Sequence, residues 1–587
     1  MNYDLNQFVG QKDEKNATYK ALRKLLTLID DERQTLVLAF VAILTNSGLS
    51  LVGPMLIGRT IDQYVQTKQY DGVLGNAGLL LALYTVAFGA NYLQTRLMGG
   101  VGQRTLFKLR NAVFNKLQEL PVAFFNQNKA GDLISRINND TDKLNQFFSQ
   151  SLMQFVGSIF TMTGAGLFLL SIDLPLGAAA LSPSILIWVF TNATSVWVKR
   201  TNAVNLKSVG SLSADIQESL NNFKVIIAFN RRDYFRKRFE EVNQHNYKTA
   251  VGAGIANNIF IPVYGLAASV GQLIVLTFGI YLISTERFTI GLLISFLSYV
   301  TNFYNPLRQL AALWANFQVA LAGWDRISHM LALKTNLQTV ENPLTAPTSS
   351  LLSFQNVSFS YPNGHEVLHN INFILEQGKT YALVGPTGGG KTTTASLMAR
   401  LYDPTSGTIL LDGKDIRAYG SEERTRKIGF ILQEPFLFTG TVRENILYGN
   451  EPYQHYSNEQ LAQVIQEANL EGLLERFDEG LETKVQTTGD IISLGQKQLI
   501  AFIRAMLRNP ELLILDEATA NIDTVTEQLL EEILQNLPAT TTRIIIAHRL
   551  NTIETADEIF FINAGQVIRA GSLNEAVDML LHGKRVS

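Results

Sequence analysis

The chain has 587 residues, which is long for a single domain. It contains no cysteine, and this excludes disulfides and thiolate metal sites. The formal net charge of −2 hides two unlike halves, because 30 Lys and Arg stand against 20 Asp and Glu up to residue 340, and 19 against 31 after it. We therefore expect an apolar, basic N-terminal part and a mixed, acidic C-terminal part.

Six apolar stretches occupy the first part, at 35–57, 73–95, 149–172, 174–196, 254–283 and 288–314. A helix that crosses a bilayer needs about 20 mostly apolar residues. One such stretch could be a buried helix of a large soluble core, but six in succession favour membrane spans. Asn, Gly, Ser and Pro interrupt several of them, and a membrane bundle tolerates this where polar groups face its interior.

The loops after the second and fourth stretches are long and rich in Lys and Arg, whereas the opposite connections, such as "IDLP" and "STERF", are short and poor in them. The positive-inside rule places both long loops and both termini in the cytoplasm. Their helical patterning predicts spans that continue well beyond the bilayer, with solvated charged hairpins as the alternative. We expect a multi-pass protein, in the inner membrane if the source is bacterial.

A segment rich in Thr, Pro, Ser and Asn then marks a linker. We predict an all-α transmembrane domain with six helices at 1–335, the linker at 336–350 and an α/β domain at 351–587. In the last of these, "YALV", "IGFIL", "LLIL" and "IIIA" are short apolar runs that each end at polar residues. Such runs suit buried parallel strands, whose carboxyl ends collect ligands at one edge of the sheet.

The phosphate-loop motif G-x-x-x-x-G-K-[ST] is matched in full by "GPTGGGKT", which follows the first of these runs. In this motif backbone amides wrap phosphates, Lys391 reaches the β- and γ-phosphates, and the Thr392 hydroxyl takes Mg²⁺. The predicted cofactors are ATP and Mg²⁺. The loop residues concerned are Gly385, Pro386, Thr387, Gly388, Gly389, Gly390, Lys391, Thr392 and Thr393.

Other strand ends supply candidate catalytic groups. Asp516 would hold Mg²⁺ directly or through water, and Glu517 is placed to polarise the attacking water, although such a pair could also cap a helix. Gln433 and His548 end two further runs, and their shared strand-end position favours a functional role. Gln433 is a third candidate metal ligand, beside Thr392 and Asp516.

A capping box opens a helix at "ISLGQKQL", where Ser493 is followed by Gln496. Backbone amides at a helix N-terminus form an anion site. The unexpected residue is Leu494, because a close backbone approach to an anion would favour glycine.

The ordered motifs "FSYP", "GPTGGGKT", "LQEPFLFTGTVRENI", "ISLGQKQ", "LLILDEATANID" and "IIAHR" resemble the nucleotide-binding domain of ABC transporters. With six spans before them, the whole chain resembles an exporter half-transporter. The resemblance implies that Tyr361 stacks on adenine and that Gln433 senses Mg²⁺ and the γ-phosphate. It implies further that Glu517 is the catalytic carboxylate, that Asp523 communicates across a dimer and that His548 contacts the γ-phosphate.

In this family ATP lies between two nucleotide-binding domains packed head to tail, so that the cap of one chain, here Ser493, Gly495 and Gln496, faces the ATP of its partner. This sequence departs from the family pattern "LSGGQ" at Ile492 and Leu494. The bulk of leucine and its restricted backbone would impair that site, whereas the chain's own phosphate loop is intact. The resemblance therefore favours one subunit of a heterodimer, with a tolerated substitution in a homodimer as the alternative.

We expect ATP-driven export of amphipathic small molecules, such as drugs or lipids. The expected partners are a second half-transporter, membrane lipids and the cargo, without nucleic acid. A lipid or lipopeptide flippase is the nearest alternative. A peptide exporter shares the same engine, and a regulatory or channel-like subunit is disfavoured by the intact Glu517 and His548.

Overall fold

The computed structural model describes residues 3–5, 30–334, 337, 339–340, 350–362, 364–486, 492–516, 524–546, 553–571 and 573–582. These residues separate into two compact units. One lies within Val9–Leu117 and Gly131–Ala332, and the other within Met1–Phe8, Gln118–Ala130 and Leu333–Ser587. The helical unit and the sheet-containing unit are described in turn, each by itself.

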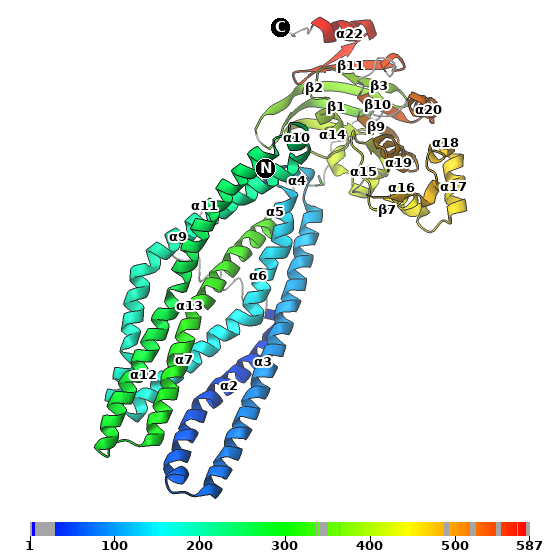
Figure 1. Cartoon of the computed structure of the whole chain (residues 1–587). Coiled ribbons are helices and arrows are strands. Elements are labelled where there is room, and N and C mark those ends of the chain that lie inside the picture. Colours follow the sequence, from blue (N-terminus) through cyan, green and yellow to red (C-terminus); the bar gives the residue numbers. More distant parts are fainter. Residues whose placement is uncertain are drawn as a thin grey trace. The chain divides into compact units, whose positions relative to one another are not determined.

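Helices make up the first unit, and the longest of them carry the apolar stretches (Figure 1). They are α2 (Arg33–Thr60), α3 (Tyr70–Glu119), α5 (Ala130–Ser135), α6 (Thr141–Gln146), α7 (Leu152–Ile172), α8 (Leu174–Leu181), α9 (Pro183–Asn221), α10 (Phe223–Ala228), α11 (Arg232–Asn258), α12 (Phe260–Ser284) and α13 (Ile290–Ala332). Three π-helical segments, Ile61–Val65, Arg136–Asp140 and Phe147–Ser151, continue or join them.

The predicted helical extension beyond the bilayer is confirmed. Helix α3 alone has 50 residues, or roughly 75 Å at 1.5 Å per residue, against a hydrocarbon core of about 30 Å. The long loops are therefore continuations of helices rather than solvated hairpins.

Five candidate membrane spans are found among the described residues, within Asp30–Val65, Tyr70–Glu119, Ala130–Ile172, Leu174–Asn221 and Arg232–Ser284. The sixth predicted span lies on α13, which is long enough at 43 residues. It is less apolar than the other five, because Thr301, Asn302, Asn305 and Arg308 interrupt its hydrophobic part.

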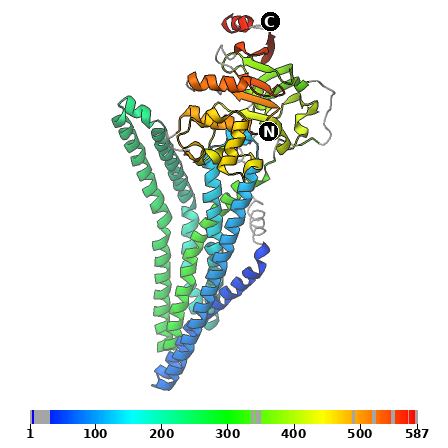
Figure 2. The ribbon, with the colours of Figure 1, turned by 90° about the vertical axis from the view of Figure 1, so that its right-hand side faces the viewer.

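Helix α13 packs against α2, α7 and α12, and α9 runs beside α11 (Figures 1 and 2). The α2–α13 crossing is close enough that a Cβ on Gly291 would lie 2.0 Å from the Gly58 carbonyl oxygen. At the same end, Oδ1 of Asp62 accepts a 2.8 Å hydrogen bond from the Gly291 amide. Between α9 and α11, Asn202 and Asn257 exchange two side-chain hydrogen bonds of 2.8 and 3.0 Å.

The second unit contains a six-stranded sheet in the order β12-β11-β3-β10-β9-β6. All neighbouring strands are parallel except β12, which is antiparallel to β11. The strands are β3 (Thr380–Val384), β6 (Ile428–Ile431), β9 (Leu512–Asp516), β10 (Thr542–Ile546), β11 (Glu558–Asn563) and β12 (Gln566–Ala570). Every residue of β3 and β9 is buried, as continuous apolar runs predict.

An antiparallel sheet, β2-β1-β4-β5, and a short pair, β7 with β8, complete the strands of the described residues. Their bounds are β1 (Ser350–Ser360), β2 (Glu366–Glu376), β4 (Ser406–Leu411), β5 (Lys414–Asp415), β7 (Gly440–Thr441) and β8 (Lys484–Val485). The helices of this unit are α4 (Val122–Gln127), α14 (Lys391–Met398), α15 (Ser421–Lys427), α16 (Val442–Leu447), α17 (Asn458–Glu467), α18 (Glu471–Leu474), α19 (Leu494–Met506), α20 (Thr524–Gln535) and α22 (Leu573–His582).

Candidate nucleotide site

The phosphate loop joins the end of β3 to the start of α14. Gly385, Gly388 and Gly390 have φ angles of +145°, +81° and +115°, a region that side chains disfavour. A Cβ on Gly385 would also lie 2.0 Å from the carbonyl oxygen of Ile562. Glycine is thus required here both by the backbone conformation and by the close approach of β11.

Lys391 is the first residue of α14, and only 6% of it is exposed. Its ammonium group donates hydrogen bonds to the carbonyl oxygens of Gly385, at 2.9 Å, and Pro386, at 3.2 Å. The loop therefore holds the lysine charge over its own backbone, where it can meet a bound phosphate.

Two candidate oxygen ligands for a metal ion lie beside this loop. The hydroxyl of Thr392 lies 3.5 Å from Oδ1 of Asp516, the buried last residue of β9. Hydroxyl and carboxylate oxygens suit Mg²⁺, which usually takes one or two protein carboxylates and completes its shell with phosphate and water. Among the described residues no group of three or more His, Asp or Glu could hold a metal ion.

Gln433 follows β6, the strand next to β9, and so belongs to the same edge of the sheet. Its backbone oxygen accepts a 3.4 Å hydrogen bond from the side chain of Gln498 on α19. Only 1% of Gln498 is exposed. The sequence motifs predicted the helix but not this contact, since nothing in the pattern marks that amide as different from its neighbours.

Tyr361 lies in an aromatic cluster. Its ring is edge-on to Phe359 and Tyr402, with centroids 4.9 and 5.4 Å away. Its hydroxyl shares a 3.0 Å hydrogen bond with the Thr393 hydroxyl on α14. These contacts fix the half-buried ring beside the helix that carries the phosphate loop. Tyr402 was not singled out by the sequence.

The capping box predicted at the start of α19 is confirmed. The Ser493 hydroxyl accepts a 3.1 Å hydrogen bond from the Gln496 amide, and the Gln496 side chain accepts one of 3.0 Å from the Ser493 amide. Gln496 also donates to the Arg476 carbonyl oxygen at 3.0 Å. The polar side chains of this cap thus serve the helix, so an anion bound here would be held by backbone amides of its first turn.

Leu494 is the first residue of α19, and 38% of it is exposed. It is not among the residues with positive φ. The expected backbone restriction is therefore not felt, because leucine adopts the helical conformation without strain. Its effect on an anion at this cap comes from the bulk of the side chain.

Glu517, Asp523 and His548 lie outside the described residues. The strands that lead to two of them are described, since β9 ends at Asp516 and β10 ends at Ile546. Because β9 and β10 are paired in parallel, the chain leaves both at the edge that carries the phosphate loop.

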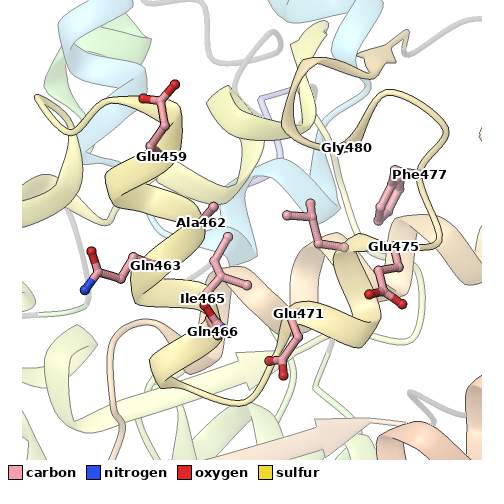
Figure 3. Close-up of a pocket in the computed structure, with 10 residues that line it drawn as sticks. Glu459, Ala462, Gln463, Ile465, Gln466, Glu471, Glu475, Phe477 and Gly480 are labelled. Carbon is pink, nitrogen blue, oxygen red and sulfur yellow. The ribbon is translucent and has the colours of Figure 1, made fainter.

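A surface pocket of about 630 Å³ lies between α17 and α18 (Figure 3). It is lined by Glu459, Glu471 and Glu475 beside apolar groups such as Ile465 and Phe477. None of its lining residues belongs to the predicted nucleotide site, and three carboxylates would repel a polyphosphate. We assign the pocket no role in nucleotide binding.

Membrane-spanning helices on a chain that also carries a phosphate loop at the end of a parallel strand define a membrane protein driven by nucleotide hydrolysis. Comparison with known proteins gives the family. The chain matches the family model of the ABC transporter transmembrane region at residues 36–307 and the ABC transporter family model at residues 368–520. The chain belongs to the ABC transporter family.

Three relatives are exporter half-transporters, and the chain covers most of the length of each. The chain is 34% identical to the uncharacterized ABC transporter ATP-binding protein YfiC of Bacillus subtilis, over 95% of this chain and 92% of that protein. It is 33% identical to a fatty acid ABC transporter ATP-binding/permease protein of Mycobacterium bovis, over 86% and 80%. It is 31% identical to a multidrug resistance ABC transporter ATP-binding and permease protein of Lactococcus lactis, over 86% and 85%.

Family membership makes this chain an ATP-binding, ATP-hydrolysing transporter subunit of the exporter type. It is a multi-pass membrane protein with its nucleotide-binding domain in the cytoplasm. As a half-transporter it works as a dimer, with a copy of itself or with another chain.

Proposed function

We propose that this chain is one subunit of a heterodimeric exporter that uses Mg²⁺-ATP to move amphipathic small molecules, drugs or lipids, across the membrane. The proposal includes the domain division predicted from the sequence, with the transmembrane domain at 1–335, the linker at 336–350 and the ATP-binding domain at 351–587. The observation that carries the heterodimer is Leu494, exposed at the cap of α19 in a chain whose own phosphate loop is intact.

Within this proposal Tyr361 stacks on adenine and the loop 385–393 wraps the phosphates. Thr392 and Asp516 would hold Mg²⁺, which supplies charge neutralisation at the β- and γ-phosphates when bound. The 3.5 Å between their oxygens supports this assignment. Gln433 senses that site from the end of β6, while Glu517 orients the attacking water and His548 contacts the γ-phosphate.

The proposed dimer has two composite ATP sites, each made of the phosphate loop of one chain and the cap of the other. The site that uses the cap of this chain would be the weak one. The cap of this chain, with Ser493, Gly495 and Gln496, meets the ATP held by the partner's phosphate loop, and Asp523 contributes to communication across the dimer. A leucine side chain beside the cap amides holds a γ-phosphate away from them. Since an anion gains from helix-terminal amides only within about the first turn, a small displacement loses much of the interaction.

Two relatives support an amphipathic cargo, because one is named a fatty acid transporter and another a multidrug resistance transporter. ATP binding would clamp the two nucleotide-binding domains together and favour an outward-facing state. Hydrolysis at the intact site would then reset the clamp.

The test is ATP-dependent uptake of a fluorescent amphipath into inside-out vesicles that contain this chain together with the half-transporter that co-purifies with it. We expect uptake by the pair, none with Lys391→Ala and little by this chain alone. A fully active homodimer would contradict the heterodimer. Ion current without ATP turnover would identify a channel-like subunit, and movement of labelled phospholipid alone would identify a lipid flippase.

A further inference from the structure

A three-residue segment, Tyr3–Leu5, is packed into the sheet-containing unit. Tyr3 is fully buried, and only 3% of Leu5 is exposed. The Tyr3 ring lies edge-on to the ring of Phe124 on α4, with centroids 6.4 Å apart, and Phe124 is itself fully buried. Burial of two large aromatic rings removes much apolar surface from water, so this short segment has a specific seat. We call Tyr3–Leu5 the Tyr3 strap.

The backbone of the Tyr3 strap is held by two carboxamide side chains at the end of α4. The Asn128 side chain donates a 2.9 Å hydrogen bond to the Tyr3 carbonyl oxygen and accepts one of 3.2 Å from the Leu5 amide. The Gln127 side chain accepts a 2.8 Å hydrogen bond from the Tyr3 amide. Asn128 also donates to the Phe124 carbonyl oxygen at 2.8 Å, which fixes the orientation of its carboxamide. These side chains pair with the strap as a neighbouring strand would.

A further hydrogen bond attaches the strap to the segment that follows the last predicted span. The Tyr3 hydroxyl donates to the Lys334 carbonyl oxygen at 3.0 Å. Helix α13 ends at Ala332, just before this residue. All the contacts of the strap named here lie within the sheet-containing unit. The strap thus joins α4, from the loop between the second and third predicted spans, to the chain that leaves α13.

Helix α4 depends on such contacts for its position. It has six residues, too few for a helix that is stable by itself. Pro121 before it and Asn128 after it both have an extended backbone, so that α4 is continuous with neither α3 nor α5. The strap covers Phe124, one of the two buried residues of α4. Release of the strap would therefore leave α4 free to shift.

A shift of α4 would be felt at the nucleotide site. Asn126 of α4 donates a 2.7 Å hydrogen bond to the Tyr402 hydroxyl, and the Tyr402 ring packs edge-on against Tyr361. A hydrogen bond weakens steeply when its geometry is disturbed. The strap therefore supports the contact through which the loop between the second and third spans meets the nucleotide-binding domain.

We propose that the Tyr3 strap is a built-in fastening of α4 that sets how strongly the transmembrane helices respond to ATP. Tyr3 belongs to no part of the proposed nucleotide site, so it is a positioning residue. Its loss should leave ATP binding and basal ATP hydrolysis intact and weaken the response of the helical unit. The inference depends neither on the nature of the cargo nor on the heterodimer.

The first measurement asks whether the strap is seated in the assembled transporter. Because the chain has no cysteine, Leu5→Cys introduces a single thiol whose reaction with a maleimide can be read on this chain. That thiol should react at least about tenfold more slowly than the one introduced by Tyr70→Cys, since 76% of Tyr70 is exposed and Leu5 is buried. Adding Tyr3→Ala should remove the protection. Equally fast reaction at positions 5 and 70 of the otherwise unmodified chain would overturn the inference.

The second measurement follows the response to ATP without any cargo. The four tryptophans of the chain all belong to the helical unit, at positions 188, 197, 314 and 324. In Tyr3→Ala, the change in tryptophan fluorescence caused by a non-hydrolysable ATP analogue should fall by about twofold or more. Affinity for the analogue and basal ATP hydrolysis should stay within about twofold of the unmodified values.

Two further variants define what is lost in Tyr3→Ala. Tyr3→Phe keeps the buried ring and loses only the hydrogen bond to Lys334, so its fluorescence response should lie between those of Tyr3→Ala and the unmodified chain. Tyr70→Ala is the matched control, because it makes the same change at an exposed tyrosine, and it should have no effect. An equal loss of response in Tyr70→Ala and Tyr3→Ala would overturn the inference.

Two other outcomes would also overturn it. In one, Tyr3→Ala exposes the thiol at position 5 but leaves the fluorescence response unchanged. In the other, melting temperature, ATP affinity, ATP hydrolysis and fluorescence response all fall together, which would show a general structural role. Amphipath uptake separates this inference from the proposed function. If no amphipath is moved but the fluorescence response depends on Tyr3, the export proposal fails and the strap stands. If amphipath is moved and the response ignores Tyr3, export stands and the strap fails.

Discussion

The side chain of Asn126 on α4 donates a 2.7 Å hydrogen bond to the hydroxyl of Tyr402. The ring of Tyr402 in turn packs edge-on against Tyr361, the proposed adenine-stacking residue. Burial raises the pKa of Tyr402, although the hydrogen bond from Asn126 opposes the shift, so the hydroxyl stays protonated. A segment between the second and third spans is thereby connected to the nucleotide site through one hydrogen bond and one ring contact.

This connection predicts that substitutions of Asn126 and Tyr402 have non-additive effects on the coupling of ATP hydrolysis to transport. Asn126→Ala and Tyr402→Phe should each lower the number of cargo molecules moved per ATP hydrolysed, because each removes the same hydrogen bond, worth about 1 kcal/mol. The double variant should be no worse than either single one. The measurement is uptake and ATP hydrolysis in the same proteoliposomes. Tyr456→Phe, which changes an exposed tyrosine, should have no effect, and additive losses would show that the two residues act separately.

Substitutions at the nucleotide site should distinguish the stacking contact of Tyr361 from the charge contact of Lys391. Tyr361→Ala should weaken ATP binding modestly, by about tenfold or less, because it removes one aromatic face of about 1 kcal/mol. Lys391→Ala should weaken it far more, since it removes a charge held within the loop by the Gly385 and Pro386 carbonyl oxygens. Titration with a fluorescent ATP analogue measures both. Comparable losses would contradict the assignment of Tyr361 to adenine.

Much of this site could be predicted from the sequence because its determinants are local. The loop 385–392 needs positive φ at several glycines, so the glycine positions in the motif predict the conformation of the loop. Apolar runs of four or five residues suffice to identify β3 and β9, because both faces of these strands are buried. The capping box of α19 is likewise complete within four residues, from Ser493 to Gln496.

Contacts between distant segments left no such pattern. Asn126 and Tyr402 are 276 residues apart, and neither type nor spacing marks them as partners. The expected backbone restriction at Leu494 was wrong, because the capping box makes Ser493 the N-cap and Leu494 the first helical residue, a position that leucine occupies without strain. The weaker hydropathy of α13 could be read from the sequence, because Asn302, Asn305 and Arg308 interrupt its apolar run.

A substitution of Glu517 should impair ATP hydrolysis without impairing ATP binding. Glu517→Gln removes the carboxylate that orients the attacking water without removing a phosphate ligand, so ATP affinity should stay within about twofold of the unmodified value. Turnover should fall by about 10²–10⁴-fold, as for the loss of a general acid–base group. Steady-state phosphate release from the purified dimer measures this. Retention of more than about half of the rate would assign the hydrolytic role to another group.

The cap of α19 distinguishes an asymmetric dimer from a symmetric one. If the cap of this chain builds the weak site, Ser493→Ala should change steady-state ATP hydrolysis by less than about twofold, although it removes the Ser493 side of the capping box. The equivalent serine change in the partner should abolish most turnover, because that cap completes the site containing Lys391 and Glu517. Leu494→Gly by itself should restore little ATP hydrolysis at the weak site. The partner's phosphate loop and carboxylate belong to that same site, and residues that act as a unit give non-additive effects. The control is Ser457→Ala, which removes a similar capping box at α17, away from the phosphate loop. If Ser493→Ala is as damaging as its counterpart in the partner, both sites hydrolyse ATP, and Leu494 is a substitution that a symmetric engine tolerates.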